Sequence, residues 1–539
     1  MNRCRLAHGL WQLANRGHGR RFARALGRPE QTQQALLQTL LLRNADTRFG
    51  IAHGFAGIRS VREFQERVPI QPPEAIAPWI EAIRAGEPAV LTREPVRRLV
   101  PTSGSTGPAR LIPWTSSLQR EFGRAVGAWT HDLFARDPAL GAGPAYWSIS
   151  PAGPVPEEAG GAVPIGLAAD SAYLGRWLAP LVDATLAVPG AVRDLQKIEA
   201  FRYVTLLCLL RAPALRLISV WHPSFLILLL DALPRHRERL LADIARGGLT
   251  LPEEEAPSAR IAALGRRFAP LPARARALAG ADFTDPTSLW PGLRLVSAWT
   301  DARAAEPAAE LAERLPGVAF QAKGLLATEA VISLPFAGRH PLAVTSHFVE
   351  FLDDAGRARQ AHEVTPGERY RPLVTTGGGL YRYDLGDRVE VTGRLGATPT
   401  LRFLGRDDRV SDQCGEKLSD TFVQGVLDRL LAAARGVRFA MLAPDPRPDG
   451  QPGYTLFLEA ETPPTDGAAR LEQGLADNPH YAHARWLGQL APVALQPVRG
   501  AQRAYLHAPQ HRGRLGEIKP AALDARPGWR AVLTGTREA

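Results

Sequence analysis

Apolar side chains recur every three to four residues in several segments of the chain, which is the spacing of one helix face. Residues 30–46 carry leucines at such positions, and a longer stretch with the same spacing begins at Ser116. Further helices are expected at 304–314 and at about 419–434. The apolar positions that define the helix after Ser116 are Leu118, Phe122, Val126, Trp129 and Leu133.

Short apolar runs that alternate with polar positions predict strands elsewhere. The chain is expected to form a strand, a loop and a second strand over about 88–115. Short strands are expected around the helix within 290–335. Residues 342–404 combine short alternating runs with glycine-bearing turns, which is typical of an antiparallel region.

The pattern changes near Arg406, where Gly405 and the charged run 406–409 predict a hinge. We therefore expect a large N-terminal α/β domain over residues 1–406 and a small, mobile C-terminal domain over 407–539. The second domain is predicted as a compact α+β unit with short connections. Its expected elements are strands near 437–443, 453–461 and 493–498 and helices near 419–434 and 480–490.

The most apolar stretch, residues 203–233, is interrupted by arginine, histidine and proline. It contains no clean apolar span of about 20 residues, so buried helices and strands are expected rather than a membrane span. Residues 1–22 lack the apolar core of a signal peptide. Their Arg-rich, amphipathic character leaves an organelle transit peptide as the alternative.

Composition narrows the class of protein. Hydrophobic residues make up 45% of the chain and charged residues 22%, which is globular rather than disordered composition. The three cysteines Cys4, Cys208 and Cys414 are isolated, which argues against a disulfide scaffold or a cysteine zinc site and favours the cytoplasm. The net charge of +11 comes from dispersed arginines, so a basic surface is favoured over a nucleic-acid site.

Lysine is rare in this chain. Only four of the 65 basic residues are lysine, namely Lys197, Lys323, Lys417 and Lys519. Arginine replaces lysine at most surface positions with little loss, but a compact ammonium at a reacting centre has no such substitute. Lysines that remain are therefore enriched in special roles, although Lys197 is interpreted as a surface residue.

Residues 101–113, PTSGSTGPARLIP, form the first segment with recognisable chemistry. A turn rich in threonine, serine and glycine lets backbone N–H groups and hydroxyls approach an anion. It is not a Walker loop, because no Gly-Lys-Ser/Thr closes it. A plain surface turn is the alternative. The candidate residues are Ser103, Gly104, Ser105, Thr106 and Gly107.

Four further segments carry polar residues beside predicted strands or helices. In 323–330, KGLLATEA, Glu329 follows a small polar residue and could hold a metal or a ribose, although a solvated strand end is the alternative. In 381–387, YRYDLGD, a Gly-Asp turn could present Asp387 to a pair of ribose hydroxyls. The remaining two segments are 401–420, which combines the predicted hinge with Glu416-Lys417 just before a helix, and GEIKP at 516–520.

Taken in this order, the segments resemble the auxin-responsive acyl acid amido synthetases (the Gretchen Hagen family), within the superfamily of adenylate-forming enzymes. The resemblance also includes the stretch NADTRFGIAHGFAGIRSVREFQERVPI and the closing stretch HARWLGQLAPVALQPV. It implies the adenylate-forming, firefly-luciferase-like α/β fold, with a mobile C-terminal domain.

The resemblance also implies roles for individual residues. Ser103, Gly104, Ser105, Thr106 and Gly107 match the phosphate-binding loop. Thr328 and Glu329 match the motif beside adenine, the α-phosphate and Mg²⁺, with Glu329 as a metal ligand. The other matches are Asp387 and Arg406 at the ribose, Lys417 in the Glu-Lys motif of the mobile domain, and Lys519 at the phosphates.

The resemblance further implies ATP and Mg²⁺ as cofactors, and a small carboxylic acid and an amine, expected to be an amino acid, as substrates. An acyl-CoA synthetase that uses the same acyl-adenylate is the first alternative, and a non-catalytic nucleotide-binding relative is the second. Arg110 stands where the family loop has a lysine. His347 is expected to be structural, and Tyr381 and Tyr383 to pack either at the nucleotide or in the core. The particular acid, the acceptor and the oligomeric state are not specified by the sequence.

Overall fold

The computed structural model divides the chain into two compact units, which separate between Gly405 and Arg406. The first comprises residues 1–100 and 111–405, and the second comprises 101–110 and 406–539. The structure describes residues 3–101, 110–148, 162–166, 179–195, 197–251, 259–301, 304–406, 410–432, 434–506, 508 and 522–535.

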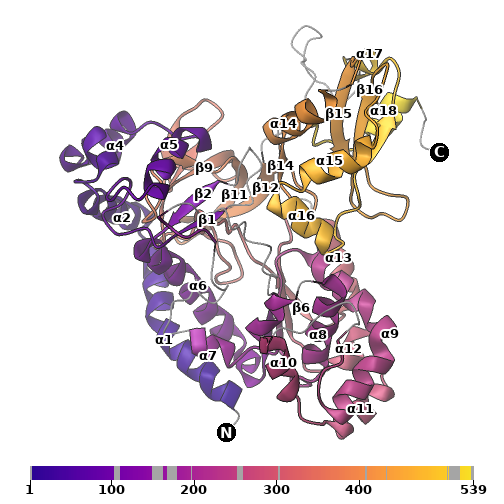
Figure 1. Ribbon diagram of the computed structural model, residues 1–539. Coiled ribbons are helices and arrows are strands. Elements are labelled where there is room, and N and C mark those ends of the chain that lie inside the picture. The colour runs from indigo at the N-terminus through magenta and orange to yellow at the C-terminus, as the bar shows by residue number, and fades with distance from the viewer. Residues whose placement is uncertain are drawn as a thin grey trace. The chain divides into compact units, whose positions relative to one another are not determined.

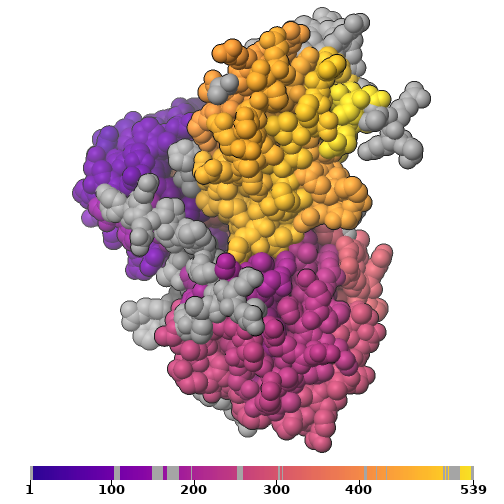
Figure 2. All heavy atoms as spheres, turned by 45° about the vertical axis from the view of Figure 1, so that its right-hand side comes forward, coloured from indigo at the N-terminus to yellow at the C-terminus, as the bar shows by residue number. Residues whose placement is uncertain are grey.

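A parallel sheet forms one layer of the first unit (Figure 1). Its four strands follow the order β3 (Ala145–Trp147), β4 (Leu217–Ser219), β5 (Leu295–Ala298) and β6 (Ala319–Ala322), and each neighbouring pair is parallel. The connections between the strands contain helices, as parallel pairing requires. They include α8 (Ile198–Leu210), α9 (Pro223–Arg246) and α13 (Ala305–Arg314). In Figure 2, residues of about 200–320 form one closely packed lobe.

The apolar stretch at 203–233 belongs to this lobe. It supplies most of α8, all of β4 and the first half of α9, and its side chains are largely buried. The interrupting prolines lie where elements begin or between them, and Pro223 occupies the first position of α9. Within the described residues, no helix combines the length and the apolar character needed to cross a bilayer.

The second sheet of this unit has the order β12, β11, β9, β7, β8, with β10 (Tyr383–Asp384) beside β9. Strand β7 pairs antiparallel with β8 and β9, and β9 pairs antiparallel with β10 and β11, which confirms the antiparallel region expected at 342–404. The other bounds are β7 (Phe348–Leu352), β8 (Ala358–Gln360), β9 (Arg369–Thr375), β11 (Asp387–Leu395) and β12 (Thr398–Arg406).

Helix α6 (Ser116–Arg136) precedes both sheets in the chain and confirms the helix expected after Ser116. It follows a short strand pair, β1 (Arg98–Pro101) and β2 (Leu111–Trp114), as the sequence also predicts. The Thr115 hydroxyl accepts the N–H of Leu118 and caps the helix. The same hydroxyl donates to the carbonyl of Gly377, so the start of α6 is fixed to a distant segment.

Helix α1 (Arg3–Ala25) was not among the helices expected from the sequence, and Leu6, Leu10 and Leu13 place apolar side chains on its exposed side. It packs along α6, and Trp11 lies in a buried cluster with Phe134 of α6 and Leu217 of β4. Two glycines permit the close contact. A Cβ on Gly19 would lie 1.9 Å from the ring of His131, and a Cβ on Gly127 would lie 2.8 Å from the Asn15 side chain.

The other helices of the N-terminal part cover the antiparallel layer. Helix α2 confirms the helix expected at 30–46, and its Gln33 amide donates to the carbonyls of Val344 and His347. The helices are α2 (Pro29–Arg43), α3 (Arg48–Ala52), α4 (Val61–Arg67) and α5 (Pro73–Arg84). Around the parallel sheet lie α7 (Ala179–Asp183), α10 (Ala259–Arg266), α11 (Pro272–Ala279) and α12 (Pro286–Leu289).

The second unit is built on a three-stranded sheet in the order β15, β16, β17. Strands β15 (Phe439–Pro444) and β16 (Tyr454–Glu459) are antiparallel, whereas β17 (Ala494–Pro497) is parallel to β16. Alternating side chains point to two apolar clusters, so that Leu442 and Leu456 lie in one and Met441 and Phe457 in the other. The sheet is therefore covered on both faces.

Helices of the second unit supply both clusters. Helix α14 confirms the helix expected from about Ser419. The Ser419 hydroxyl caps this helix by accepting the N–H of Phe422. The helix ends at Leu431, earlier than expected. The helices are α14 (Asp420–Leu431), α15 (Gly467–Leu475), α16 (Pro479–Trp486), α17 (Ala501–Leu506) and α18 (Trp529–Thr534), and a short hairpin joins β13 (Val410–Ser411) to β14 (Leu418–Ser419).

The contact between α1 and α6 can be tested with two glycines of one helix. Gly19→Ala places a methyl group against the Cβ and ring of His131, and we expect the free energy of unfolding to fall by about 1–3 kcal/mol. Gly17 is exposed, and a Cβ there meets nothing within 4 Å. Gly17→Ala should therefore raise the free energy by about 0.5–1 kcal/mol through helix propensity. Urea denaturation would measure both, and the same sign for both variants would contradict the packing.

Candidate functional site

The structure describes part of the predicted site. Thr328, Glu329 and Asp387 lie in the first unit, and Lys417 lies in the second. Arg406 ends strand β12, and its backbone alone is described. The predicted residues that lie outside the described part of the chain are Ser103, Gly104, Ser105, Thr106, Gly107 and Lys519.

Thr328 and Glu329 occupy a tight turn a few residues beyond the end of β6. The Ala327 N–H donates to the Ala330 carbonyl at 2.9 Å, which closes the turn. On either side, Leu326 and Val331 form an antiparallel bridge. Glu329 exposes only 5% of its surface, although it is an acidic residue in a loop. The turn therefore places a threonine and a largely buried glutamate at neighbouring positions of a constrained backbone.

A buried histidine, His347, forms a hydrogen bond with the backbone next to this turn. The N–H of Val331 donates to Nε2 of His347 at 3.1 Å, so the ring proton lies on Nδ1. Nδ1–H then donates to a carboxylate oxygen of Glu121 at 2.9 Å. His347 is fully buried, and both of its ring nitrogens are used within the fold. This arrangement confirms that His347 is structural.

Glu121 joins three segments that are far apart in the sequence. Its side chain projects from α6, which follows the predicted phosphate-binding loop and β2. Its carboxylate accepts His347 Nδ1–H and also the backbone N–H of Gly377, at 2.9 and 3.0 Å to the two oxygens. Gly377 begins the segment that leads to Asp387. The Thr328–Glu329 turn and the approach to Asp387 are thus held by one buried carboxylate.

Sequence reasoning did not identify Glu121. The only signal was an acidic residue beside Phe122, at the margin of the apolar face of α6. An acidic residue in that position is buried only when it is paired or hydrogen-bonded. Its partners lie more than 200 positions away, at His347 and Gly377, so no local pattern predicts them.

Asp387 begins strand β11 directly after a turn, as the Gly-Asp pattern predicts. Gly386 has a φ of +73°, which favours glycine, and its N–H donates to the Asp384 side chain at 2.9 Å. Asp387 itself exposes 4% of its surface. The turn therefore presents a largely buried carboxylate at the start of a strand.

The residues before this turn belong to the core. Tyr381 stacks on Phe49 with ring centroids 5.0 Å apart, and its hydroxyl donates to the Leu91 carbonyl. Arg382 adopts a φ of +48° and donates from Nε to Glu350 at 3.0 Å in a buried ion pair. Tyr383 is buried in the same apolar cluster as Tyr381. Of the two interpretations of these tyrosines, the structure supports core packing.

Lys417 lies in the loop of the β13–β14 hairpin in the second unit. Its φ is +43°, an uncommon conformation for a residue other than glycine. The preceding Glu416 is fully buried and accepts the N–H groups of Gln413 and Cys414 and the Tyr454 hydroxyl. Burial raises the pKa of Glu416. The acidic residue of the Glu-Lys motif therefore anchors the loop, and the lysine takes the strained position.

Glu329 is the one described residue predicted to bind Mg²⁺, and its surroundings suit that ion. No group of three or more histidine, cysteine or acidic residues within the described ranges could form a complete metal cage. Glu329 is instead a single carboxylate in a backbone turn. Mg²⁺ commonly keeps several waters and is held by one or two carboxylates together with substrate phosphates. The residue therefore suits a metal that arrives with a nucleotide.

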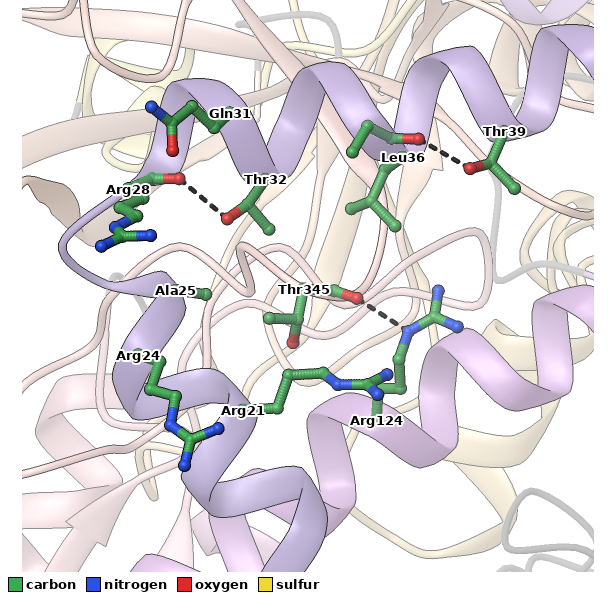
Figure 3. Close-up of a pocket in the computed structure, with 11 residues that line it drawn as sticks. Arg21, Arg24, Ala25, Arg28, Gln31, Thr32, Leu36, Thr39, Arg124 and Thr345 are labelled. Carbon is green, nitrogen blue, oxygen red and sulfur yellow. Dashed lines mark hydrogen bonds between the residues drawn. The ribbon is translucent and has the colours of Figure 1, made fainter.

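A separate cavity of about 640 Å³ opens between α1, α2 and α6. Four arginines line it, and Figure 3 shows Arg124 beside Thr345, whose carbonyl accepts from Arg124 Nε at 2.7 Å. None of the described site residues lines this cavity. It is a basic recess distinct from the motif turns, and its arginines are Arg21, Arg24, Arg28 and Arg124.

Comparison with protein families gives matches over most of the first unit. The model described as "GH3 family N-terminal domain" matches residues 19–317, and "GH3 family central domain" matches residues 340–406. The chain is also 27% identical over 463 residues to a protein of Oryza sativa subsp. japonica named probable indole-3-acetic acid-amido synthetase GH3.12. That alignment covers 76% of this chain and 74% of the relative.

Solved structures share the fold. The AtGH3.15 acyl acid amido synthetase in complex with 2,4-DB superposes with a TM-score of 0.65 at 18% identity, covering 97% of this chain and 95% of that one. The 2-hydroxyisobutyryl-CoA ligase in complex with 2-HIB-AMP and CoA gives a TM-score of 0.50 at 13% identity, covering 92% and 89%. The expected adenylate-forming α/β fold is confirmed.

The buried connection between Glu121 and His347 can be tested with a double-mutant cycle. Glu121→Ala and His347→Ala each leave a buried polar partner unsatisfied, so each should lower the free energy of unfolding by about 2–4 kcal/mol. Because the two side chains bond to each other, the double variant should lose at least about 1 kcal/mol less than the sum. Chemical denaturation measures all three. Additive effects would contradict the direct contact.

Proposed function

The chain belongs to the GH3 family, and from this membership we propose that it is a ligase that activates a small carboxylic acid with ATP. The acyl group of the resulting acyl-adenylate is then transferred to an amine, most simply that of an amino acid. The names of the similar proteins, which are amido synthetases, support this assignment. The location remains a prediction, and we propose the cytoplasm because no disulfide joins the three cysteines.

One observation carries the proposal beyond family likeness. The Glu121 carboxylate holds together the Thr328–Glu329 turn, the segment leading to Asp387, and the helix that follows the hydroxyl-rich loop. These are the segments to which the nucleotide roles were assigned. A catalyst that positions one ATP molecule with several loops needs such a rigid connection, because small errors in position reduce the rate strongly.

The reaction has two balanced steps. One oxygen of the substrate carboxylate attacks the α-phosphorus of ATP, a new O–P bond forms, the bond between the α- and β-phosphates breaks, and pyrophosphate leaves. A neutral amine then attacks the carbonyl carbon, AMP leaves with the bonding electrons, and the amine nitrogen releases a proton. No protein nucleophile takes part.

The chain's own residues would act by binding and charge. Asp387 would accept hydrogen bonds from the ribose hydroxyls, and Arg406 would lie near the same sugar. Thr328 would contact the nucleotide beside Glu329, which would hold Mg²⁺. When bound, Mg²⁺ neutralises charge on the phosphates. The loop residues Ser103, Gly104, Ser105, Thr106 and Gly107 would bind phosphate oxygens through N–H groups and hydroxyls.

The two lysines among the predicted site residues, Lys417 and Lys519, belong to the proposed mobile domain, which comprises residues 407–539. Lys519 would stabilise the charge that accumulates on the phosphates during adenylation, and Lys417 would serve the second step. Gly405 supports a hinge, because its φ is +130° and a Cβ there would meet nothing within 4 Å. Rotation about this point would exchange the two lysines at the nucleotide.

The acceptor can be identified by direct assay. The protein is incubated with ATP, Mg²⁺ and a panel of aryl, indole and short-chain acids, and acid-dependent exchange of pyrophosphate into ATP is measured first. Amino acids or CoA are then added with the best acid, and products are identified by mass spectrometry. We expect an amide. A thioester would show an acyl-CoA synthetase, and absence of exchange with every acid would favour a non-catalytic relative.

The role of Lys519 is tested against a matched lysine. Lys519→Ala should slow acid-dependent pyrophosphate exchange by about 10²–10³-fold, which is the usual effect of removing one group that stabilises transition-state charge. Its melting temperature should change little. Lys197 is exposed, and Lys197→Ala should change neither quantity. An exchange rate in Lys519→Ala equal to that of the wild type would refute the assignment.

A further inference from the structure

Lys323 leaves the parallel sheet at the edge where ligands of such sheets usually bind. It directly follows β6, and its N–H donates to the Ala298 carbonyl, which continues the pairing with β5. Ser219 ends β4 at the same edge, and Trp221 follows it. In open parallel sheets, ligands bind outside the carboxyl ends of the strands. Lys323 therefore lies at the edge where a substrate is expected.

The side chain of Lys323 is enclosed by three residues from two segments, the end of β4 and helix α6. Nζ donates to the Ser219 hydroxyl at 2.6 Å. It also lies 5.2 Å from the ring centroid of Trp129 on α6 and 5.3 Å from that of Trp221. Trp129 is itself fixed, because its Nε1–H donates to the Gln321 side chain at 2.8 Å. Indole faces attract a cation, so the two rings offset part of the cost of burying the ammonium group.

The ammonium has no protein counter-ion in the described part of the chain. Lys323 exposes 6% of its surface, yet no aspartate or glutamate of the described residues forms an ion pair with it. One N–H is used by Ser219, which leaves two donors. A buried charge without a partner is costly. A ligand that carries the missing negative charge would satisfy it.

Nearby titratable groups do not supply that charge. His222 follows Trp221 and faces Ser224, and Asp301 beyond β5 accepts the N–H of Phe403. Asp132, one turn beyond Trp129 on α6, accepts the N–H of Ala337. Burial lowers the pKa of Lys323 to about 7, and no charged neighbour contributes to that change.

We propose that Lys323 binds the carboxylate of the acid substrate, between the indole rings of Trp129 and Trp221. The inference rests on the proposed function. A single ammonium matches a monoanion, whereas the polyanionic phosphates were assigned to the hydroxyl-rich loop, Mg²⁺ and Lys519. Trp221 is 41% exposed, and its ring centroid lies 5.7 Å from that of Trp299. An aromatic surface therefore extends from the lysine toward solvent. Such a surface suits a flat, apolar acid.

Binding without ATP tests the inference. Calorimetry compares indole-3-acetate with indole-3-acetamide, which has nearly the same shape without the charge, and benzoate and 2,4-DB extend the panel. Lys323→Met keeps an apolar chain of similar length, and we expect it to weaken carboxylate binding by about 10–100-fold, the effect of losing one desolvated charge contact. Binding of the amide should change less than about threefold. The matched variant Lys197→Met should bind both ligands as the wild type does.

The pH dependence gives a readout that a merely structural role would not produce. The acid is anionic throughout pH 6–9, so any change comes from the protein. A bound carboxylate raises the pKa of Lys323 above the free value of about 7. Wild-type affinity should therefore be constant below pH 7 and fall by up to about tenfold per pH unit above it. In Lys323→Met the affinity should not depend on pH in this range.

Three results would overturn the inference: unchanged carboxylate affinity in Lys323→Met, equal loss for the acid and the amide, or no binding of any panel carboxylate by the wild type. Thermal melting excludes misfolding, and Lys323→Met should be at least as stable as the wild type because a buried charge is removed. Failure of the proposed function looks different. Lysine-dependent carboxylate binding without pyrophosphate exchange would refute adenylation alone, and exchange with an unchanged KM for the acid would refute the role of Lys323 alone.

Discussion

A single buried carboxylate connects three segments of the first unit that are proposed to lie at or beside the ATP site. Glu121 accepts His347 Nδ1–H and the Gly377 N–H, and through His347 it also holds the Val331 N–H. Each group is buried, and an unsatisfied member would be costly. The network is therefore stable only when α6, the 327–331 turn and the 377–387 segment are all in place. Formation of the fold and assembly of the site are the same event in this region.

The second constraint is the packing that keeps α6 in position. Its N-terminus is tied to Gly377 by Thr115, and its middle is held against α1 at Gly127. Its C-terminal half contributes Trp129 to the Lys323 environment. One helix thus presents Glu121 to the segments proposed to bind the nucleotide and Trp129, eight positions further along, to the proposed acid site. A long rigid helix fixes the distance between these two functions.

Local patterns predicted the elements well and their long-range connections poorly. Helix α6, the antiparallel region and the turn before Asp387 follow from periodicity and from glycine and aspartate at defined positions. The partners of Glu121 and the rings around Lys323 come from segments about 100 to 250 residues away. Nothing in the local sequence specifies such contacts. Helix α1 was missed for another reason, since exposed leucines (Leu6, Leu10 and Leu13) reduce the contrast between its two faces.

The presence of a lysine at position 323, in a chain that has only four, has a physical explanation. The chain uses arginine almost everywhere, but this site encloses its cation between two indoles at the end of a short strand. A guanidinium is larger and planar and has five donors, so it would leave more N–H groups unsatisfied in the same space. It would also remain charged, whereas burial brings the pKa of Lys323 to about 7. An ammonium can therefore lose its charge when no anion is bound and regain it with one, which makes the empty site less costly to maintain.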